Sequence, residues 1–220
     1  MAAVQLDNIA VRIMGRWVLS GLEAEVPLGQ QVLLTGANGA GKTTLLRLIA
    51  TALRPHAGRL SLFGQSSPGA LRAARKRLGL MTHQHYFYEP LSAAQNLRLI
   101  GQLSGHNDVT EHNSLLQQVN LWSHRDRPVA SYSAGMKRRL ALARLTLLRP
   151  DLVLLDEPFG QLDPDGVQLM HQAIRAMAAR GATIIVATHD IDRGEALCTL
   201  RWHLTPGRPG ITFSALGAKS

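Results

Sequence analysis

Cysteine is almost missing from this chain, which carries a single one, Cys198, among 220 residues. One cysteine excludes an internal disulfide and fits a reducing compartment. Long apolar runs are missing too, since none approaches the ~20 residues that a membrane-spanning helix needs. Residues 1–15 contain no basic region followed by a continuous apolar block, so we expect no signal peptide. We therefore expect neither a disulfide-stapled scaffold nor a membrane span in this sequence.

Acidic residues are scarce relative to basic ones, with 15 Asp and Glu against 24 Lys and Arg and a formal net charge of +9. A basic balance suits nucleic acid or the anionic inner face of a membrane. An ordinary arginine-rich proteome gives the same balance, so charge alone does not choose a partner. Hydrophobic residues make up 45% of the chain, which is enough for one large domain or a core with an inserted subdomain.

One glycine-rich stretch organises the chain: GANGAGKTT fits the phosphate-loop pattern G-x-x-x-x-G-K-[ST]. An apolar run from Gln31 to Thr35 precedes it as a buried strand would, and leucines at helical spacing follow it as far as Pro55. Lys42 is placed to reach the β- and γ-phosphates, and the Thr43 hydroxyl suits Mg²⁺. Curled glycine backbone points successive N–H groups at phosphate oxygens. We expect these loop residues to bind nucleotide: Gly36, Ala37, Asn38, Gly39, Ala40, Gly41, Lys42, Thr43 and Thr44.

The remaining sequence alternates strands and helices around a helical block. Between residues 85 and 148 the patterns are helical, and Ser92 with Gln95 forms a capping box. Strands are predicted elsewhere, at 4–13, 57–64, 78–83, 152–156, 183–189 and 201–205. We therefore predict a single α/β domain with a core over 1–84 and 149–205, an inserted helical subdomain over 85–148, and a loosely held tail over 206–220.

The stretch LVLLDEP, residues 152–158, is an apolar run that ends in two acids. A buried strand here delivers Asp156 beside Mg²⁺ and Thr43. Glu157, one residue further on, can accept a proton from an attacking water. The alternative interpretation is a strand that ends in an ordinary acidic turn. The position of this stretch behind a phosphate loop argues against that alternative.

Together with residues 130–145, these motifs resemble one family over nearly the full chain, the ATP-binding cassette (ABC) ATPases. YSAGM, at Tyr132–Met136, stands where the family has its L-S-G-G-Q signature; Ser133 and Gly135 are kept, and the other three positions depart. In the family this signature starts a helix and meets the γ-phosphate of ATP held by the opposite subunit, and a helix N-terminus suits an anion. The resemblance implies a P-loop NTPase fold with a mainly parallel sheet core, an N-terminal antiparallel β region and an inserted α-helical subdomain.

Four further positions match the family one at a time. Gln84 resembles the glutamine that reaches Mg²⁺ and the water, His189 resembles the switch histidine that contacts the γ-phosphate, and GQLD at Gly160–Asp163 resembles the D-loop. Trp17 is the expected adenine-stacking aromatic, with a core position as the alternative. His83 and His85 form H-x-H, where no metal is expected because no third ligand is suggested. The resemblance thus implies Glu157, His189, Lys42 and Gln84 in catalysis, Thr43, Gln84 and Asp156 on the metal, and Trp17, Ser133 and Gly135 on the nucleotide.

The resemblance also implies partners. Two copies, or one copy and a related ATPase, would sandwich ATP with Mg²⁺ and hydrolyse it. A membrane-spanning permease subunit would dock on residues 84–97, at the cytoplasmic face of the inner membrane, with the chain bound peripherally. Tyr86, Phe87 and Tyr88 either anchor that partner or pack the helical block. No specific nucleic acid is expected.

Three stretches, THQHYFYEPLSAAQNLRLIGQLSG, SAGMKRRLALARL and LLDEPFGQLDPDG, resemble the ATPase subunit of the bacterial haem exporter of cytochrome c maturation. Drug or polysaccharide exporter ATPases share many of these features and stay open as alternatives. A soluble ABC ATPase acting on DNA or ribosomes would usually carry a coiled-coil insertion or two cassettes. A small-molecule kinase would leave the signature, Gln84 and His189 unexplained.

Overall fold

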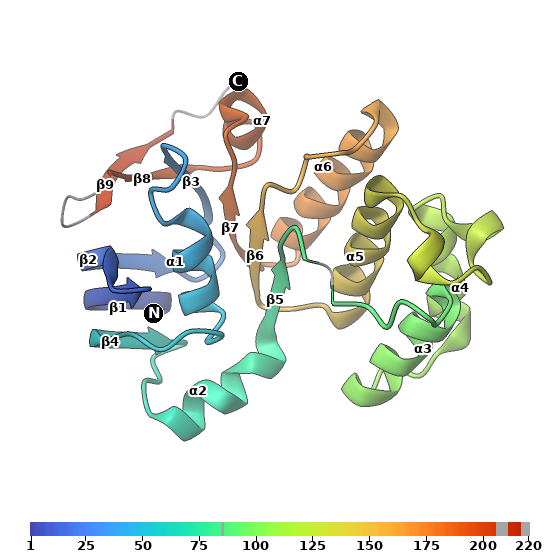
Figure 1. The fold of residues 1–220 in the computed structure, drawn as a ribbon, viewed down its shortest axis with the longest axis horizontal. Coiled ribbons are helices and arrows are strands. Elements are labelled where there is room, and N and C mark those ends of the chain that lie inside the picture. The colour runs from blue at the N-terminus through green and yellow to red at the C-terminus, as the bar shows by residue number, and fades with distance from the viewer. Residues whose placement is uncertain (85, 206–210, 217–220) are drawn as a thin grey trace.

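The computed structural model describes residues 1–84, 86–205 and 211–216, and a six-stranded sheet forms its centre (Figure 1). Neighbouring strands pair parallel except at one edge, where β9 runs antiparallel to β8. The predicted mainly parallel core is therefore confirmed. In the order β5-β6-β7-β3-β8-β9 the strands span Leu78–Met81, Leu152–Asp156, Thr183–Ala187, Gln31–Gly36, Leu200–Leu204 and Ile211–Ala215.

A second, antiparallel sheet carries the N-terminus and is ordered β2-β1-β4 (Figure 1). Its strands span Ala2–Ile13 (β1), Arg16–Pro27 (β2) and Ala57–Leu62 (β4). Their inward residues, such as Ile9 and Leu19, share one buried cluster with Leu46 and Trp202. The antiparallel region expected from the family resemblance is therefore present, and it packs against α1 and one face of the central sheet.

Alternation along the central strands sends side chains to two different cores. On β3, Leu34 packs in the cluster that faces the antiparallel sheet, whereas Leu33 packs in the cluster that faces α5 and α6. The fully buried apolar runs of β6 and β7 are typical of parallel strands covered on both faces. Because β3, β7 and β6 pair in parallel, the carboxyl ends of β3 and β6 lie at the same edge of the sheet.

Helix α1, Lys42–Ile49, is shorter than the sequence predicts. Its periodicity continues to Arg54, but the backbone leaves the helix at Thr51, which has φ 58°. The basic helix predicted near residue 71 is α2, Pro68–Ala74, extended by a 3₁₀ turn over Arg75–Arg77.

Three helices form the predicted helical block: α3 over Ala93–Ser104, α4 over Val109–Gln118 and α5 over Ala134–Leu148. Two 3₁₀ turns, at Trp122–His124 and Val129–Ser131, lie between α4 and α5. The capping box of Ser92 and Gln95 is confirmed in both directions. Over residues 86–148, which are all described, the chain forms no strand. His85 lies outside the described residues, and so does the predicted H-x-H pair that includes it.

The C-terminal part completes the fold and corrects one prediction. Helix α6, Pro164–Ala179, begins at its Asp163 cap as expected, and α7 spans Ile191–Glu195. Within the tail after Thr205, which is predicted to be loosely held, Ile211–Ala215 instead form β9, which pairs with β8 residue by residue, with Ile211 opposite Leu204. An exposed edge strand favours such pairing because its backbone groups otherwise lack partners. Residues 206–210 and 217–220 of that tail lie outside the described residues.

No helix within the described residues combines the length and the apolar character required to cross a bilayer.

Candidate functional site

The phosphate loop joins β3 to α1, as predicted, and its glycines are required by close contacts. Gly36 has φ 146° and Gly41 has φ 100°. A Cβ atom at Gly36 would lie 2.5 Å from the main-chain oxygen of Leu204, and one at Gly41 would lie 2.8 Å from Leu19 Cδ2. Larger residues at either position would therefore push the loop off the two sheets that hold it.

Lys42 begins α1 and lies almost buried, with 8% of its surface exposed. Its ammonium donates to the main-chain oxygens of Gly36, at 2.7 Å, and Ala37, at 3.2 Å. The cation thus spans the mouth of the loop, where the helix N-terminus adds positive potential. The cavity here has a volume of about 290 Å³ and is lined by Val18, Asn38, Gly39, Ala40, Gly41, Lys42, Thr43, Thr44, Asp156 and Glu157.

Thr43 and Asp156 meet at the edge where β3 and β6 end. The Thr43 hydroxyl donates to Asp156 Oδ2 at 2.8 Å. Asp156 is only 5% exposed, because β6 is covered on both faces. A hydroxyl and a carboxylate are hard oxygen ligands of the kind that Mg²⁺ prefers, so this donor set fits the metal expected from the sequence.

Glu157 follows Asp156 in a left-handed conformation, with φ 49°. Its Oε2 accepts hydrogen bonds from the Thr188 hydroxyl at 3.0 Å and contacts the His189 ring Nδ1 at 2.8 Å. Its Oε1 accepts from the His189 main-chain N–H at 3.0 Å. The structure thus brings together the predicted base and the predicted switch histidine, and these contacts aim the Glu157 carboxylate from β6 toward β7.

The sequence analysis missed Arg138, which lies behind these acids. Its Nη1 donates to the main-chain oxygen of Glu157 at 2.6 Å, and the residue is 3% exposed. Burial lowers the pKa of Arg138, and the nearby charges of Asp156 and Glu157 oppose that shift. The signal was available, because Arg138 stands four residues before Leu142 on the buried face of α5.

Ser133 and Gly135 lie in a different cavity, of about 480 Å³, at the start of α5. Ser133 Oγ accepts from the Met136 N–H at 3.2 Å and so caps the helix. A Cβ atom at Gly135 would lie 2.8 Å from the main-chain oxygen of Gln161. The structure thus joins the signature to the D-loop stretch but not to the chain's own phosphate loop. The lining is Asn120, Leu121, His124, Ser133, Ala134, Gly135, Met136, Arg139, Gln161 and Asp163.

Two predicted site residues lie outside the lining of the loop cavity: Gln84, predicted at the metal, and Trp17, predicted at the adenine. Gln84 is exposed, and its Oε1 accepts a hydrogen bond from the Tyr86 hydroxyl at 2.7 Å, so its role at the metal stays a prediction. Trp17 is 57% exposed, next to Val18 of the cavity wall, so the alternative that placed it in the core is wrong. Its ring meets His56 edge-on, with centroids 6.1 Å apart.

The aromatic cluster at residues 86–88 is predicted either to anchor a partner or to pack the helical block, and its side chains differ in exposure. Tyr86 and Tyr88 are 69% and 63% exposed, whereas Phe87 packs against the buried cluster of the helical block. Asn96 holds this segment in place, because its side-chain oxygen accepts from the Tyr88 N–H at 2.9 Å and its amide donates to the Tyr88 oxygen at 3.1 Å. The two tyrosines are therefore presented outward from a fixed backbone.

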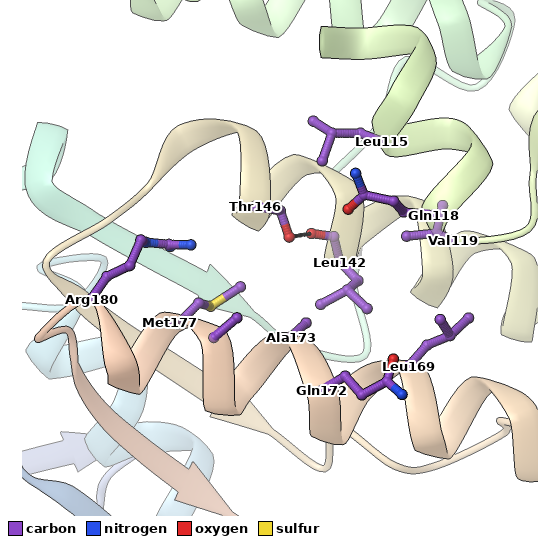
Figure 2. A pocket seen from close by; sticks show the side chains of 11 residues that line it. Leu115, Gln118, Val119, Leu142, Thr146, Leu169, Gln172, Ala173, Met177 and Arg180 are labelled. Atoms are coloured by element: carbon purple, nitrogen blue, oxygen red, sulfur yellow. Dashed lines mark hydrogen bonds between the residues drawn. The ribbon is translucent and has the colours of Figure 1, made fainter.

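A separate groove lies between α4, α5 and α6, away from the phosphate loop (Figure 2). Apolar side chains from the three helices face one another in it, and Thr146 turns its hydroxyl to the Leu142 oxygen at 3.1 Å (Figure 2). Arg180 is the one charged residue of its lining. Nothing in this groove provides a nucleophile or a proton acceptor for catalysis.

Comparison with known proteins agrees with this geometry. A model of the ABC transporter family matches residues 19–160. The chain is 35% identical over 211 residues to the Nod factor export ATP-binding protein I of Burkholderia lata, covering 94% of this chain and 69% of that protein. The protein of the same name from Rhizobium johnstonii is 34% identical over 209 residues, covering 94% and 67%.

Solved structures give the same fold. One described as the ATP-binding subunit of an ABC transporter superposes with a TM-score of 0.88 at 26% identity, covering 97% of this chain and 90% of the other. A dimeric ATP-binding cassette in a post-hydrolysis state with ADP and Pi superposes with a TM-score of 0.85, covering 98% and 99%. The second match, at 21% identity, speaks for the fold alone.

Proposed function

This chain belongs to the ABC transporter family, and we propose that it is the ATP-hydrolysing subunit of an exporter whose membrane-spanning part is a separate chain. The observation that carries this proposal is the 2.8 Å hydrogen bond between Thr43 and Asp156. It joins the phosphate loop to the acidic end of β6, where Glu157 directly follows Asp156. A P-loop that merely binds nucleotide does not need a proton acceptor there.

In this proposal the loop N–H groups and Lys42 bind the β- and γ-phosphates. Thr43 and Asp156 hold Mg²⁺, which supplies neutralisation of phosphate charge when it is bound. Glu157 takes the proton of the attacking water, and its contacts with Thr188 and His189 orient its carboxylate. The His189 side chain is 78% exposed, so it remains accessible to the γ-phosphate.

A second copy of the chain, or a related ATPase, would complete the site. Ser133 is exposed at the N-terminus of α5, in a cavity separate from the chain's own loop. A two-fold arrangement would place Ser133 and Gly135 of each copy against the nucleotide held by the other. Gln84 would report nucleotide binding to the helical block.

The membrane-spanning partner would dock on residues 84–97, at the cytoplasmic face of the inner membrane. Support comes from Tyr86 and Tyr88, which are exposed aromatic side chains on a backbone fixed by Asn96. Exposed aromatic anchors of this kind are frequent at binding hot spots.

The cargo is the finer part of the proposal. The relatives named above act, by their names, in Nod factor export, and this favours an exporter other than the haem system. Export of haem for cytochrome c maturation rests on the resemblance of three sequence stretches and has no support from these relatives. We therefore place the chain with the small exporters and keep haem export as the second candidate.

Co-expression with the membrane protein encoded beside the chain tests the partner. We expect the chain to sediment with membranes only when that protein is present, and Tyr86→Asp with Tyr88→Asp to abolish this. Leu103→Asp is the matched control, because Leu103 is 80% exposed on α3. ATP hydrolysis by the purified chain tests the activity itself, and sedimentation with ribosomes would contradict the proposal. Loss of c-type cytochromes on deletion of the chain would favour haem export.

A further inference from the structure

A basic concavity lies beyond the C-terminal end of α1, the end remote from the phosphate loop. It has a volume of about 530 Å³ and is formed by the turn after α1, the start of β4 and helix α2. Its lining is Thr51, Leu53, Arg54, Pro55, Gly58, Arg59, Leu60, Ser66, Pro68, Leu71, Arg72 and Arg75. The nucleotide site uses none of these residues.

The charges in this concavity are all positive. Arg54 lies in the turn after α1, and Arg59 lies on β4. Arg72 lies on α2 and Arg75 at the C-terminal cap of that helix, and no carboxylate belongs to the lining. Within the described part of the chain, no hydrogen bond or ion pair reaches the side chains of Arg54, Arg59 or Arg72. Asp7 faces Arg59 across the β1–β4 pairing, but its Oδ1 accepts from Gln5 and no ion pair joins it to Arg59. Guanidinium groups gathered around one space repel one another unless an anion lies between them.

Hydrogen bonds hold the walls of this concavity in place, and part of its lining is apolar. Arg75 donates to the Thr51 hydroxyl at 2.6 Å and to the Thr51 main-chain oxygen at 3.0 Å, which fixes α2 against the end of α1. Leu60 is 4% exposed at its floor, and Leu71 is half-buried beside it. A ligand for this space therefore has an anionic group for the arginines and hydrocarbon for the floor.

We propose that this concavity binds the phosphate headgroup of an anionic membrane phospholipid. A planar guanidinium matches phosphate oxygens in a bidentate way, and several of them suit a phosphate. The glycerol and first acyl carbons of a lipid would contact the leucine floor, which a free inorganic phosphate cannot do. The net charge of +9 adds attraction to an anionic surface. The site is separate from the proposed partner surface over residues 84–97.

Vesicle sedimentation of the full chain tests the site. We expect retention on vesicles of phosphatidylglycerol and phosphatidylcholine but not on phosphatidylcholine alone. The triple variant Arg54→Gln, Arg59→Gln, Arg72→Gln should lose about tenfold or more of that binding. The charge-matched control Arg98→Gln, Arg175→Gln, Arg180→Gln removes three exposed arginines, from α3, from α6 and from the C-terminal cap of α6, and should lose less than about threefold. Unchanged ATP hydrolysis by the first triple would show that it folds.

Three outcomes would overturn the proposal. Equal losses in the two triples would mean that overall charge, and not this concavity, attracts the membrane. Inorganic phosphate that raises the thermal midpoint of the wild type but not of the first triple, without vesicle binding, would assign the site to a soluble phosphate. Retention that needs the membrane subunit in the vesicles would assign it to a protein partner.

Discussion

The guanidinium of Arg138 donates a 2.6 Å hydrogen bond to the main-chain oxygen of Glu157. This contact joins α5, the helix that begins at the signature, to the residue proposed as the general base. Arg138 is 3% exposed, and its Nε has no hydrogen-bond partner among the described residues. A buried cation held so close to Asp156 and Glu157 links any shift of α5 to the position of the Glu157 backbone.

Replacing Arg138 should affect catalysis more than nucleotide binding. For Arg138→Met we expect kcat to fall about tenfold or more with little change in KM, because the lost bond of about 1.5–3 kcal/mol holds Glu157 in place. Arg138→Lys should restore part of kcat, and Arg175→Met is the control on an exposed position. A normal kcat for Arg138→Met would contradict this role.

Removing the carboxylate of Glu157 should separate binding from hydrolysis. For Glu157→Gln we expect ATP binding to persist and hydrolysis to fall about 10²–10⁴-fold, because the amide cannot accept a proton. Size-exclusion chromatography with ATP and Mg²⁺ should then show a dimer that does not dissociate by turnover. Asp151→Asn, an exposed acid paired with Arg77 at 2.5 Å, is the control. Near-normal turnover by Glu157→Gln would disprove the assignment of the base.

Adding one methyl group at the signature should destabilise the chain. Gly135→Ala places a Cβ atom 2.8 Å from the Gln161 oxygen, so we expect a loss of about 1–3 kcal/mol in the free energy of unfolding. Hydrolysis should fall as well, because the D-loop stretch must shift. At Gly69, on α2, nothing lies within 4 Å of an added Cβ atom, so Gly69→Ala should stay within about 0.5 kcal/mol. Urea denaturation compares the two, and equal stability would contradict the contact.

Acid should weaken the start of α6 through Asp163. Hydrogen bonds from the Arg139 side chain and the Gly166 main-chain N–H lower the pKa of Asp163 below its ordinary value of 3.8. The folded chain therefore binds this proton less readily than the unfolded chain, so the contribution to stability is fully present well above pH 3.8 and is lost as the pH falls through the lowered pKa of the folded chain. Asp163→Asn keeps the helix cap and should flatten the acid side of the stability curve, measured by denaturation between neutral and acid pH. Asp165→Asn is the control, and identical curves for Asp163→Asn and wild type would refute the assignment.

Cys198 should resist thiol reagents in the folded chain. Burial raises the pKa of Cys198 to about 12, and the residue is 6% exposed. The thiolate is the reactive form, so labelling at pH 8 should be about a hundredfold slower or more in the native chain than in urea. A colorimetric disulfide reagent measures both rates. Rapid native labelling would show that the loop before β8 opens.

Sequence patterns predicted most residues of the proposed nucleotide site because its parts are local. GANGAGKTT specifies its own turn, and the run that ends in Asp156 specifies a buried strand with acids after it. Arg138 escaped notice because a basic residue in a basic stretch resembles a solvated helix face. Only its alignment with the buried leucines of α5 marks it.

The ends of helices and the pairing of edge strands were less predictable. Thr51 ends α1 although the leucine spacing continues beyond it, because backbone conformation at one residue stops a helix. The strand β9 needed the open edge of β8 as its partner. Trp17 lies on β2, whose side chains alternate between two faces, and its sequence position does not say which face meets solvent.

The sequence by itself determined the chemistry: a phosphate loop, a hydroxyl for a metal, a carboxylate behind a buried strand, and a signature helix with its serine cap. Each depends on short-range geometry that a few consecutive residues impose. Tertiary structure alone decided which groups meet. Parallel pairing placed Asp156 against Thr43 and His189 against Glu157, and helix packing buried Arg138 behind them. The same packing placed the end of α1, β4 and α2 around one concavity and so gathered four arginines of residues 54–75 there, because contacts between elements are set by how the layers pack.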